Sequence, residues 1–170
     1  MVEEPCRRSP EEIEIQVRTL LLFGEYELTI DDKNRLLIPS EIRKQLDAER
    51  DGDGFFLVTG VNKRPWLYVE RLYEQLASRR DSQLTPLRDA NDFDLLHFGK
   101  TTKLELDKQG RVLIPDKVMK KIDVGRDVIL IGGRDHLELW NRKDWELHSQ
   151  ELEERRGELS MLYRQQPPMS

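Results

Sequence analysis

Two short segments of the chain repeat one arrangement of aspartate, arginine and proline. The first runs from Asp31 to Pro39 and the second from Asp107 to Pro115. In each, a D-x-x-x-R motif is followed by four residues: an aliphatic residue, a leucine, an isoleucine and a proline. The offset is the same at both ends (107 − 31 = 76 and 115 − 39 = 76). Arginine is suited to a bidentate contact with a guanine base, and lysine to contact with a phosphate group. Because both segments also hold a lysine, they are candidate nucleic-acid-binding loops.

The aspartate and arginine of each motif also have a purely structural interpretation. An aspartate–arginine pair at the base of a hairpin is common and can do no more than fix the turn. A second copy does not decide between the two interpretations, because a duplicated fold also duplicates its structural residues. In the functional interpretation the side chains of the arginine and the lysine extend away from the tip of the hairpin loop and contact an anion. The residues concerned are Lys33, Arg35, Lys108 and Arg111.

The spacing within each motif predicts a tight hairpin loop. Three residues, 108–110, separate the two strands expected in the second copy. A three-residue hairpin loop commonly ends in one residue of positive φ, usually glycine. Gly110 occupies this place, and in the first copy it is held by Asn34, a residue type that tolerates positive φ better than most. Asp31 and Asp107 can accept hydrogen bonds from the amides of their own loops.

The elements expected around the two loops follow the same order in both halves of the chain. Alternating polar and apolar residues predict strands, and apolar residues at helical spacing predict helices. In the first half we predict strands at 25–30, 35–38, 55–59 and 66–69, a short helix capped by Ser40 and a helix at 70–80. In the second half we predict strands at 102–106, 111–114, 128–131 and 137–140, a helix capped by Asp116 and a helix at 142–164. A helix from Pro86 to about Phe98 connects the halves, and Ser9 and Pro10 predict one more over about 10–21.

Each half has too few strands to bury its own apolar face. Two interleaved halves related by a pseudo-twofold axis would remove this difficulty, so we expect one compact β-barrel with short helices on its rim. The fold class is then α+β, mainly β. We expect the following division: an N-terminal extension with a short helix at 1–22, a first repeat at 23–82, a connecting helix at 83–99, a second repeat at 100–145, and a C-terminal helix and tail at 146–170.

The charge of the whole chain argues against a generally basic nucleic-acid binder. Its 28 lysines and arginines face 33 aspartates and glutamates, for a net charge of −5. Within residues 100–121, however, seven basic residues stand against three acidic ones, whereas residues 31–44 sum only to +1. Such asymmetry permits a basic face on an acidic protein. If one loop dominates binding, we expect the second. Three further lysines are equally consistent with phosphate contacts and with a solvated helix face: Lys117, Lys120 and Lys121.

Several functional classes find no support in the sequence. Cys6 is the single cysteine, so no internal disulfide can form and a reducing cytoplasm is the simpler expectation. The three histidines show no metal-ligand spacing. No catalytic motif or phosphate-binding glycine loop appears. No apolar stretch reaches about 18 residues, and the N-terminus does not resemble a signal peptide. We therefore expect no enzyme, no metal, no cofactor, no small-molecule substrate and no membrane span.

The two motifs, together with F-G-E-Y-E-L-T-I-D at 23–31 and L-E-L-W at 137–140, resemble the MraZ family. The resemblance extends from about residue 23 to about residue 145. This family comprises transcription factors of bacterial division and cell-wall gene clusters, and it is related to the AbrB-type swapped-hairpin barrels. Two features depart from the family pattern: Asn34 stands where glycine is usual, and the helix over 10–21 has no counterpart.

The resemblance implies two tandem AbrB-like repeats that form a pseudo-twofold, swapped-hairpin, double-split β-barrel. It implies subunits joined head-to-tail into a ring, located in the cytoplasm at the nucleoid. The expected function is repression of the protein's own division and cell-wall gene cluster through binding to short tandem G-rich DNA repeats. The implied DNA-binding residues are Asp31, Lys33, Arg35, Asp107, Lys108 and Arg111, with the aspartates orienting the arginines. The alternative is an AbrB-like protein-interaction module, antitoxin- or scaffold-like, for which DNA binding is secondary.

Overall fold

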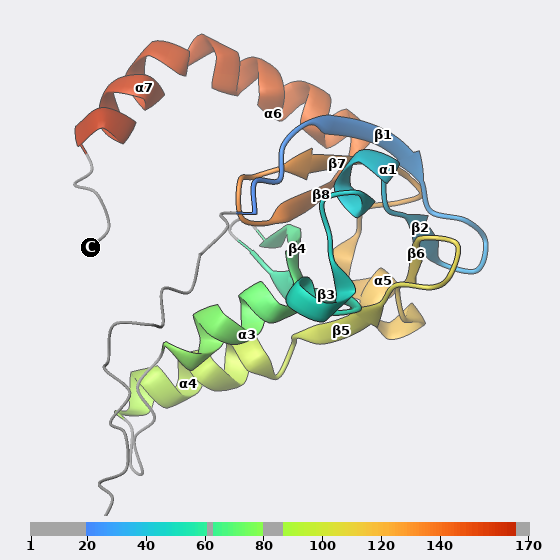
Figure 1. Ribbon diagram of the computed structural model, residues 1–170. Helices are drawn as coiled ribbons and strands as arrows, with labels where there is room; N and C mark the ends of the chain where they lie inside the picture. Colours follow the sequence, from blue (N-terminus) through green and yellow to red (C-terminus); the bar gives the residue numbers. More distant parts are fainter. Residues whose placement is uncertain (1–19, 61–62, 80–86, 166–170) are drawn as a thin grey trace, which may run out of the picture.

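The computed structural model describes residues 20–60, 63–79 and 87–165 (Figure 1). The helix predicted over about 10–21 falls almost wholly outside these residues. The first half of the chain contains β1 (Glu25–Thr29), β2 (Arg35–Leu37), α1 (Ser40–Arg43), α2 (Ala48–Asp51), β3 (Gly54–Thr59), β4 (Pro65–Val69), α3 (Glu70–Ser78) and α4 (Arg88–Phe98). The second half contains β5 (Thr102–Glu105), β6 (Arg111–Leu113), α5 (Asp116–Ile122), β7 (Asp127–Gly132), β8 (Leu137–Asn141), α6 (Arg142–Glu154) and α7 (Arg156–Gln165). All eight predicted strands are confirmed, with bounds that differ by one residue at most.

The strands form a six-stranded antiparallel sheet in the order β1-β7-β8-β4-β3-β5 and a separate two-stranded ribbon of β2 and β6. Exchanging each strand for its counterpart in the other repeat (β1 with β5, β3 with β7, β4 with β8) gives the same order read in reverse. Each repeat therefore gives its first strand to the other, since β1 pairs with β7 and β5 pairs with β3. The predicted interleaving of the two halves is confirmed by this strand order.

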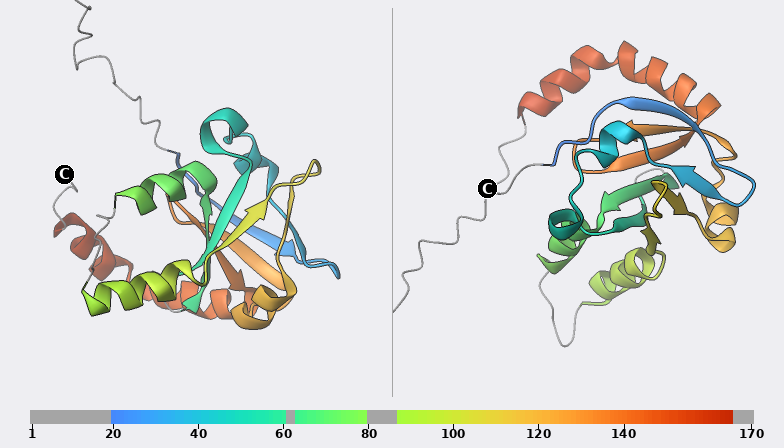
Figure 2. Two further views of the ribbon diagram at one scale, coloured as in Figure 1. Left: turned by 90° about the horizontal axis from the view of Figure 1, so that it is seen from below. Right: turned by 45° about the vertical axis from the view of Figure 1, so that its right-hand side comes forward.

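The closed β-barrel predicted from the repeat is not what the described strands form. The six-stranded sheet remains open, with β1 and β5 at its edges. The ladder of the sheet does not continue into the ribbon, and among the described residues an isolated bridge joins Leu106, the residue after β5, to Val112 of β6. β2 and β6 are three residues long and pair with each other, so they form a separate ribbon and do not extend the six-stranded sheet to closure. Figure 2 shows the ribbon lying beside the sheet.

The core is built by both repeats and holds the ribbon by its inner face. Leu36 of β2 and Val112 of β6 are fully buried, together with apolar residues of the large sheet such as Phe55, Leu130 and Leu139. Burying one such side chain stabilises a fold by roughly 1.5–3 kcal/mol. The residues on either side of Leu36 and Val112 in the two strands are partly or fully exposed. The ribbon is therefore anchored through one face and presents the other to solvent.

Several details of the helices differ from the sequence-based prediction. Ser40 and Asp116 do not cap α1 and α5, because Pro39 and Pro115 occupy the N-cap positions and neither helix has a side-chain cap. The four-residue helix α2 was not predicted; Asp47 caps it by accepting a hydrogen bond from the Arg50 backbone amide.

The C-terminal helical region is also divided differently. The single helix predicted at 142–164 is interrupted at Arg155, whose φ of −95° and ψ of 5° separate α6 from α7. In Figure 1, α6 and α7 arch along the side of the molecule that carries β1, and α3 and α4 lie on the opposite side. Both hairpin loops extend from the end of the molecule away from α7 (Figures 1 and 2).

Candidate nucleic-acid interface

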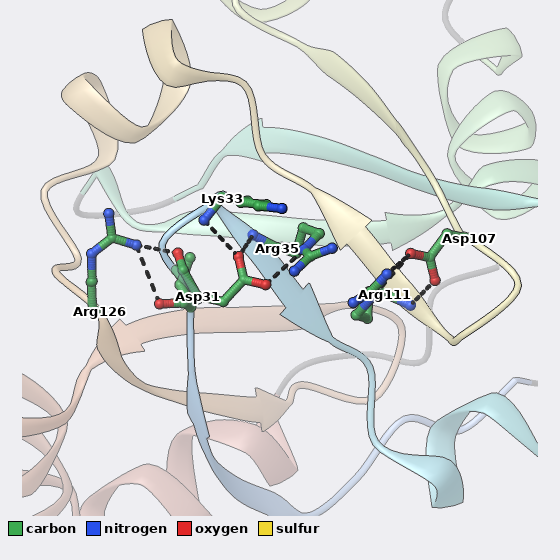
Figure 3. A network of polar contacts seen from close by, with 7 residues as sticks. Asp31, Lys33, Arg35, Asp107, Arg111 and Arg126 are labelled. Atoms are coloured by element: carbon green, nitrogen blue, oxygen red, sulfur yellow. Dashed lines mark hydrogen bonds and ion pairs between the residues drawn. The ribbon is translucent and has the colours of Figure 1, made fainter.

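The first loop is held by a network of hydrogen bonds centred on Asp31. Its Oδ1 accepts from the backbone amides of Lys33 and Arg35, both at 2.9 Å, and its Oδ2 accepts from Arg35 Nε at 2.6 Å (Figure 3). The backbone amide of Asn34 donates to the Asp31 carbonyl at 3.0 Å. Asn34 has a φ of 58°, so the positive φ predicted for this position is confirmed.

The second loop repeats this geometry. Asp107 Oδ1 accepts from the backbone amides of Gln109 and Arg111 at 2.9 Å, and Oδ2 accepts from Arg111 Nε at 3.0 Å and Nη2 at 2.9 Å. Gly110 has a φ of 79°, and its amide donates to the Asp107 carbonyl at 2.9 Å. The predicted three-residue hairpin is therefore confirmed in this copy as well.

Both aspartates are stabilised in the ionised form. The pKa of Asp31 lies below its ordinary value, because the backbone hydrogen bond from Arg35, then that residue's side chain and charge, outweigh desolvation. The pKa of Asp107 is lowered by the same contacts from Arg111. At neutral pH each loop therefore carries a fixed carboxylate that aligns the arginine guanidinium beside it.

The aspartate–arginine pairs do not use up the donors of the arginines. A guanidinium has five N–H donors in a planar fork. Asp107 occupies Nε and one N–H of Nη2 of Arg111, and within the described residues no other acceptor contacts that group. The side chains of Arg35 and Arg111 are 30% and 26% exposed. Each aspartate therefore pairs with the arginine of its own loop, as the structural interpretation predicts. The same pairing leaves N–H donors of the arginine available for a further ligand.

The pairing of β2 with β6 places the two arginines on one face. Arg35 lies opposite Leu113, and Leu37 lies opposite Arg111. Residues opposite each other, and those two positions apart along a strand, share a face of the ribbon, so all four side chains are on the outer face. Arg35 and Arg111 are diagonal neighbours, a relation that separates residues by roughly 7–8 Å. Figure 3 shows them on adjacent strands. The two motifs therefore contribute to a single surface, which sequence reasoning did not find.

The two loops lie at opposite ends of this surface. The carbonyl of Asn34 accepts a hydrogen bond from the Ile114 amide at one end, and the carbonyl of Gly110 accepts from the Ile38 amide at the other. Lys33 and Lys108, the two lysines selected from the sequence, are both exposed. They are not equivalent positions, because the offset of 76 aligns Lys108 with Asp32 and Lys33 with Gln109.

Two further arginines support the loops and were missed by sequence reasoning. Arg126 Nη1 donates to the carbonyls of Ile30 and Asp31, and so fixes the entry to the first loop (Figure 3). Arg43 Nε donates to the Ile38 carbonyl at 2.9 Å, beside the second loop. Arg126 precedes β7, and only the pairing of β7 with β1 brings it to the loop. No local pattern in the sequence signals that contact.

The described residues contain neither of two other kinds of site, a metal site or a membrane-spanning helix. Within residues 20–60, 63–79 and 87–165, no group of three or more histidine, cysteine, aspartate or glutamate side chains is arranged to hold a metal ion. None of the helices in this part of the chain is long and apolar enough to cross a membrane.

Comparison with known proteins assigns the family. The sequence model of the family described as "MraZ protein, putative antitoxin-like" matches residues 21–94 and 97–160, one match for each repeat. A protein of Clostridium tetani named transcriptional regulator MraZ is 32% identical over 126 residues, which cover 74% of this chain and 85% of that protein. The proteins of the same name from Thermoanaerobacter pseudethanolicus and Pediococcus pentosaceus are each 32% identical; the alignments cover 76% and 79% of this chain and 87% and 90% of those proteins. The chain therefore belongs to the MraZ family.

Proposed function

We propose that this protein is a sequence-specific DNA-binding transcriptional regulator. The observation that carries the proposal is the position of Arg35 and Arg111, which share the outer face of the ribbon and are each oriented by an ionised aspartate. The names of the relatives support the same class of function, and we propose no catalytic activity.

The ribbon has the dimensions that the DNA major groove accepts. That groove admits a two-stranded β-ribbon, and a guanine presents its O6 and N7 there to a bidentate arginine. In the proposed complex Arg35 and Arg111 contact guanines in one groove, and Asp31 and Asp107 orient them. Lys33 and Lys108, at the two ends of the ribbon, contact flanking phosphates. The target is a set of tandem G-rich repeats in front of the protein's own division and cell-wall gene cluster, which the protein represses at the nucleoid.

The arrangement of the repeats is, in this proposal, the swapped-hairpin, double-split arrangement of AbrB-like proteins. The exchange of β1 and β5 between the halves supports it. The repeats would span 23–82 and 100–145, joined by 83–99 and flanked by an extension at 1–22 and a helical end at 146–170.

Assembly into a ring of identical subunits is the second part of the proposal. Its support is apolar surface that the described part of one chain leaves uncovered. Helix α7 has no buried residue, and Met161 and Tyr163 are exposed on it. Helix α4 exposes Leu95 and Leu96, and Leu87 at its N-cap is exposed as well. A head-to-tail contact that closes gives a ring. A ring engages several DNA repeats at once, which multiplies a modest single-site affinity by roughly 10²–10⁴.

The proposal is tested by titrating the full chain into fluorescent duplexes and measuring anisotropy. One duplex carries the DNA upstream of the protein's own gene, and the other is a shuffled sequence of the same composition. We expect preference for the first and a steep fall in affinity with salt. Arg111→Ala should lose about 10- to 100-fold in affinity for the upstream duplex, the value of one bidentate base contact.

Arg155→Ala is the matched control, since Arg155 also pairs with a carboxylate, that of Glu158, but lies between α6 and α7. It should bind like the wild-type protein. Equal affinity for the two duplexes would overturn the proposal. If a stoichiometric protein partner copurified in that case, the AbrB-like interaction module would be the better account, and the exposed apolar residues of α4 and α7 would be its candidate surface.

A further inference from the structure

The outer face of the β2–β6 ribbon carries two leucines besides its two arginines. Leu37 is 46% exposed and Leu113 is 58% exposed. They occupy equivalent places in the two repeats, since 113 − 37 = 76. A single exposed leucine is ordinary on a protein surface. Here two stand together on a small face that otherwise presents charged side chains.

Neither leucine is needed to attach the ribbon to the core. That contact is made by the opposite face, where Leu36 and Val112 are fully buried. The exposed leucines lie instead in register with the arginines. Leu113 is directly opposite Arg35, and Leu37 is directly opposite Arg111.

The register sets what each leucine can reach when its neighbour contacts DNA. Side chains directly opposite on an antiparallel pair have Cβ atoms roughly 4.5–5.5 Å apart. Successive base pairs are about 3.4 Å apart along the helix axis. A leucine beside an arginine that contacts a guanine therefore faces an adjacent base pair. In the major groove the apolar feature of a base pair is the C5-methyl group of thymine.

We infer that Leu37 and Leu113 contact thymine methyl groups next to the guanines contacted by Arg111 and Arg35. Each pair of opposite residues, an arginine from one repeat and a leucine from the other, then acts together in base recognition. Such a pair selects a guanine that is adjacent to a thymine. This inference rests on the proposed function and names a further specificity determinant of the same surface.

The size of the effect follows from the area of one methyl group. Burial of one apolar carbon group is worth about fourfold in an equilibrium constant. Two contacted thymines, at about fourfold each, should therefore contribute on the order of tenfold to the affinity for the upstream duplex. This is smaller than the contribution of the arginines, so the inference predicts a change in base preference and retention of binding.

The test compares the upstream duplex with the same duplex in which every thymine is replaced by deoxyuridine, which lacks only the methyl group. The full-length wild-type chain should bind the deoxyuridine duplex about tenfold more weakly. The Leu37→Ala/Leu113→Ala variant should bind the thymine duplex more weakly than wild type and should not distinguish the two duplexes. Leu147→Ala, which truncates a 65% exposed leucine on α6, is the matched control and should keep the tenfold preference. Because all proteins face the same two duplexes, any effect of deoxyuridine on DNA shape cancels in the comparison.

Other outcomes separate the inference from the proposed function. A duplex with 7-deazaguanine, which lacks the N7 acceptor, should weaken binding of the wild-type and the double-leucine variant alike, since both keep their arginines. If the wild-type chain does not prefer the upstream duplex over a shuffled one, the proposed function fails. The inference alone fails if the wild-type chain prefers the upstream duplex but does not prefer thymine over deoxyuridine. It also fails alone if the double-leucine variant retains the wild-type preference for thymine. A change in molar mass of the variant by light scattering would overturn it in favour of a subunit contact. Leu37→Ser/Leu113→Ser, which carries no methyl group, repeats the test should the alanine variant fail to fold.

Discussion

The first and second hairpin loops have the same conformation but different surroundings. In both, one aspartate accepts two backbone amides and the arginine side chain, and the residue before the arginine has a positive φ. Asn34 holds this place in one loop and Gly110 in the other. The comparison indicates that the aspartate and the positive φ define the hairpin, whichever of the two residue types supplies that φ.

The surroundings differ because each loop is supported by other side chains. Asn34 Nδ2 donates to Asp116 Oδ1 at 2.5 Å and so ties the first loop to helix α5 of the other repeat. At Gly110, by contrast, an added Cβ would come within 2.5 Å of Arg43 Nε. The charges differ as well: residues 31–35 sum to zero, and residues 107–111 sum to +1. These differences support the expectation that the second loop contributes more to DNA binding.

Substitution at the fourth position of each D-x-x-x-R motif, Asn34 or Gly110, should produce the largest difference in stability. Gly110→Ala forces a side chain into a positive φ and against Arg43, so we expect a loss of about 1–3 kcal/mol in the free energy of unfolding. Asn34→Gly removes the hydrogen bond to Asp116 but relieves the backbone, so a change within about 1 kcal/mol is expected. Urea denaturation measures both. Equal losses would show that the surroundings of the two loops are energetically alike.

Substitution at the second position of each D-x-x-x-R motif, Asp32 or Lys108, should change DNA affinity, and this effect is expected to be smaller. Lys108→Asp gives the second loop the residue that the first has at the equivalent position, Asp32. We expect binding about threefold to tenfold weaker, with the slope of log affinity against log salt reduced by about one. Asp32→Lys makes the reverse change and should strengthen binding by a similar or smaller factor. Anisotropy titrations at several salt concentrations measure both. Unchanged slopes in both variants would show that these side chains do not approach phosphates.

The local parts of this account were predictable from the sequence. The strands and the two hairpins follow from alternation and from loop spacing, which depend on near neighbours. The caps at Ser40 and Asp116 were predicted wrongly, because each follows a proline that takes the N-cap position itself. The break at Arg155 was also missed, since neither glycine nor proline marks that residue.

The non-local parts were not predictable. The contact of Arg126 with the first loop spans about 95 residues of sequence. The shared face of Arg35 and Arg111 depends on the pairing of β2 with β6, two three-residue strands that the sequence does not assign to each other. The sequence thus identified the residues of the candidate site, and the strand pairing is what unites them into one surface.

The most direct measurement compares the ratio of affinities for the upstream and shuffled duplexes in four proteins: wild type, Arg35→Ala, Arg111→Ala and the double variant. If both arginines contact bases in one groove, each single variant lowers the ratio, Arg111→Ala the more strongly at about 10- to 100-fold. The double variant should lose all of the ratio except the about tenfold part that Leu37 and Leu113 contribute, and should bind otherwise through phosphate contacts. A double variant that keeps the wild-type ratio would contradict the account.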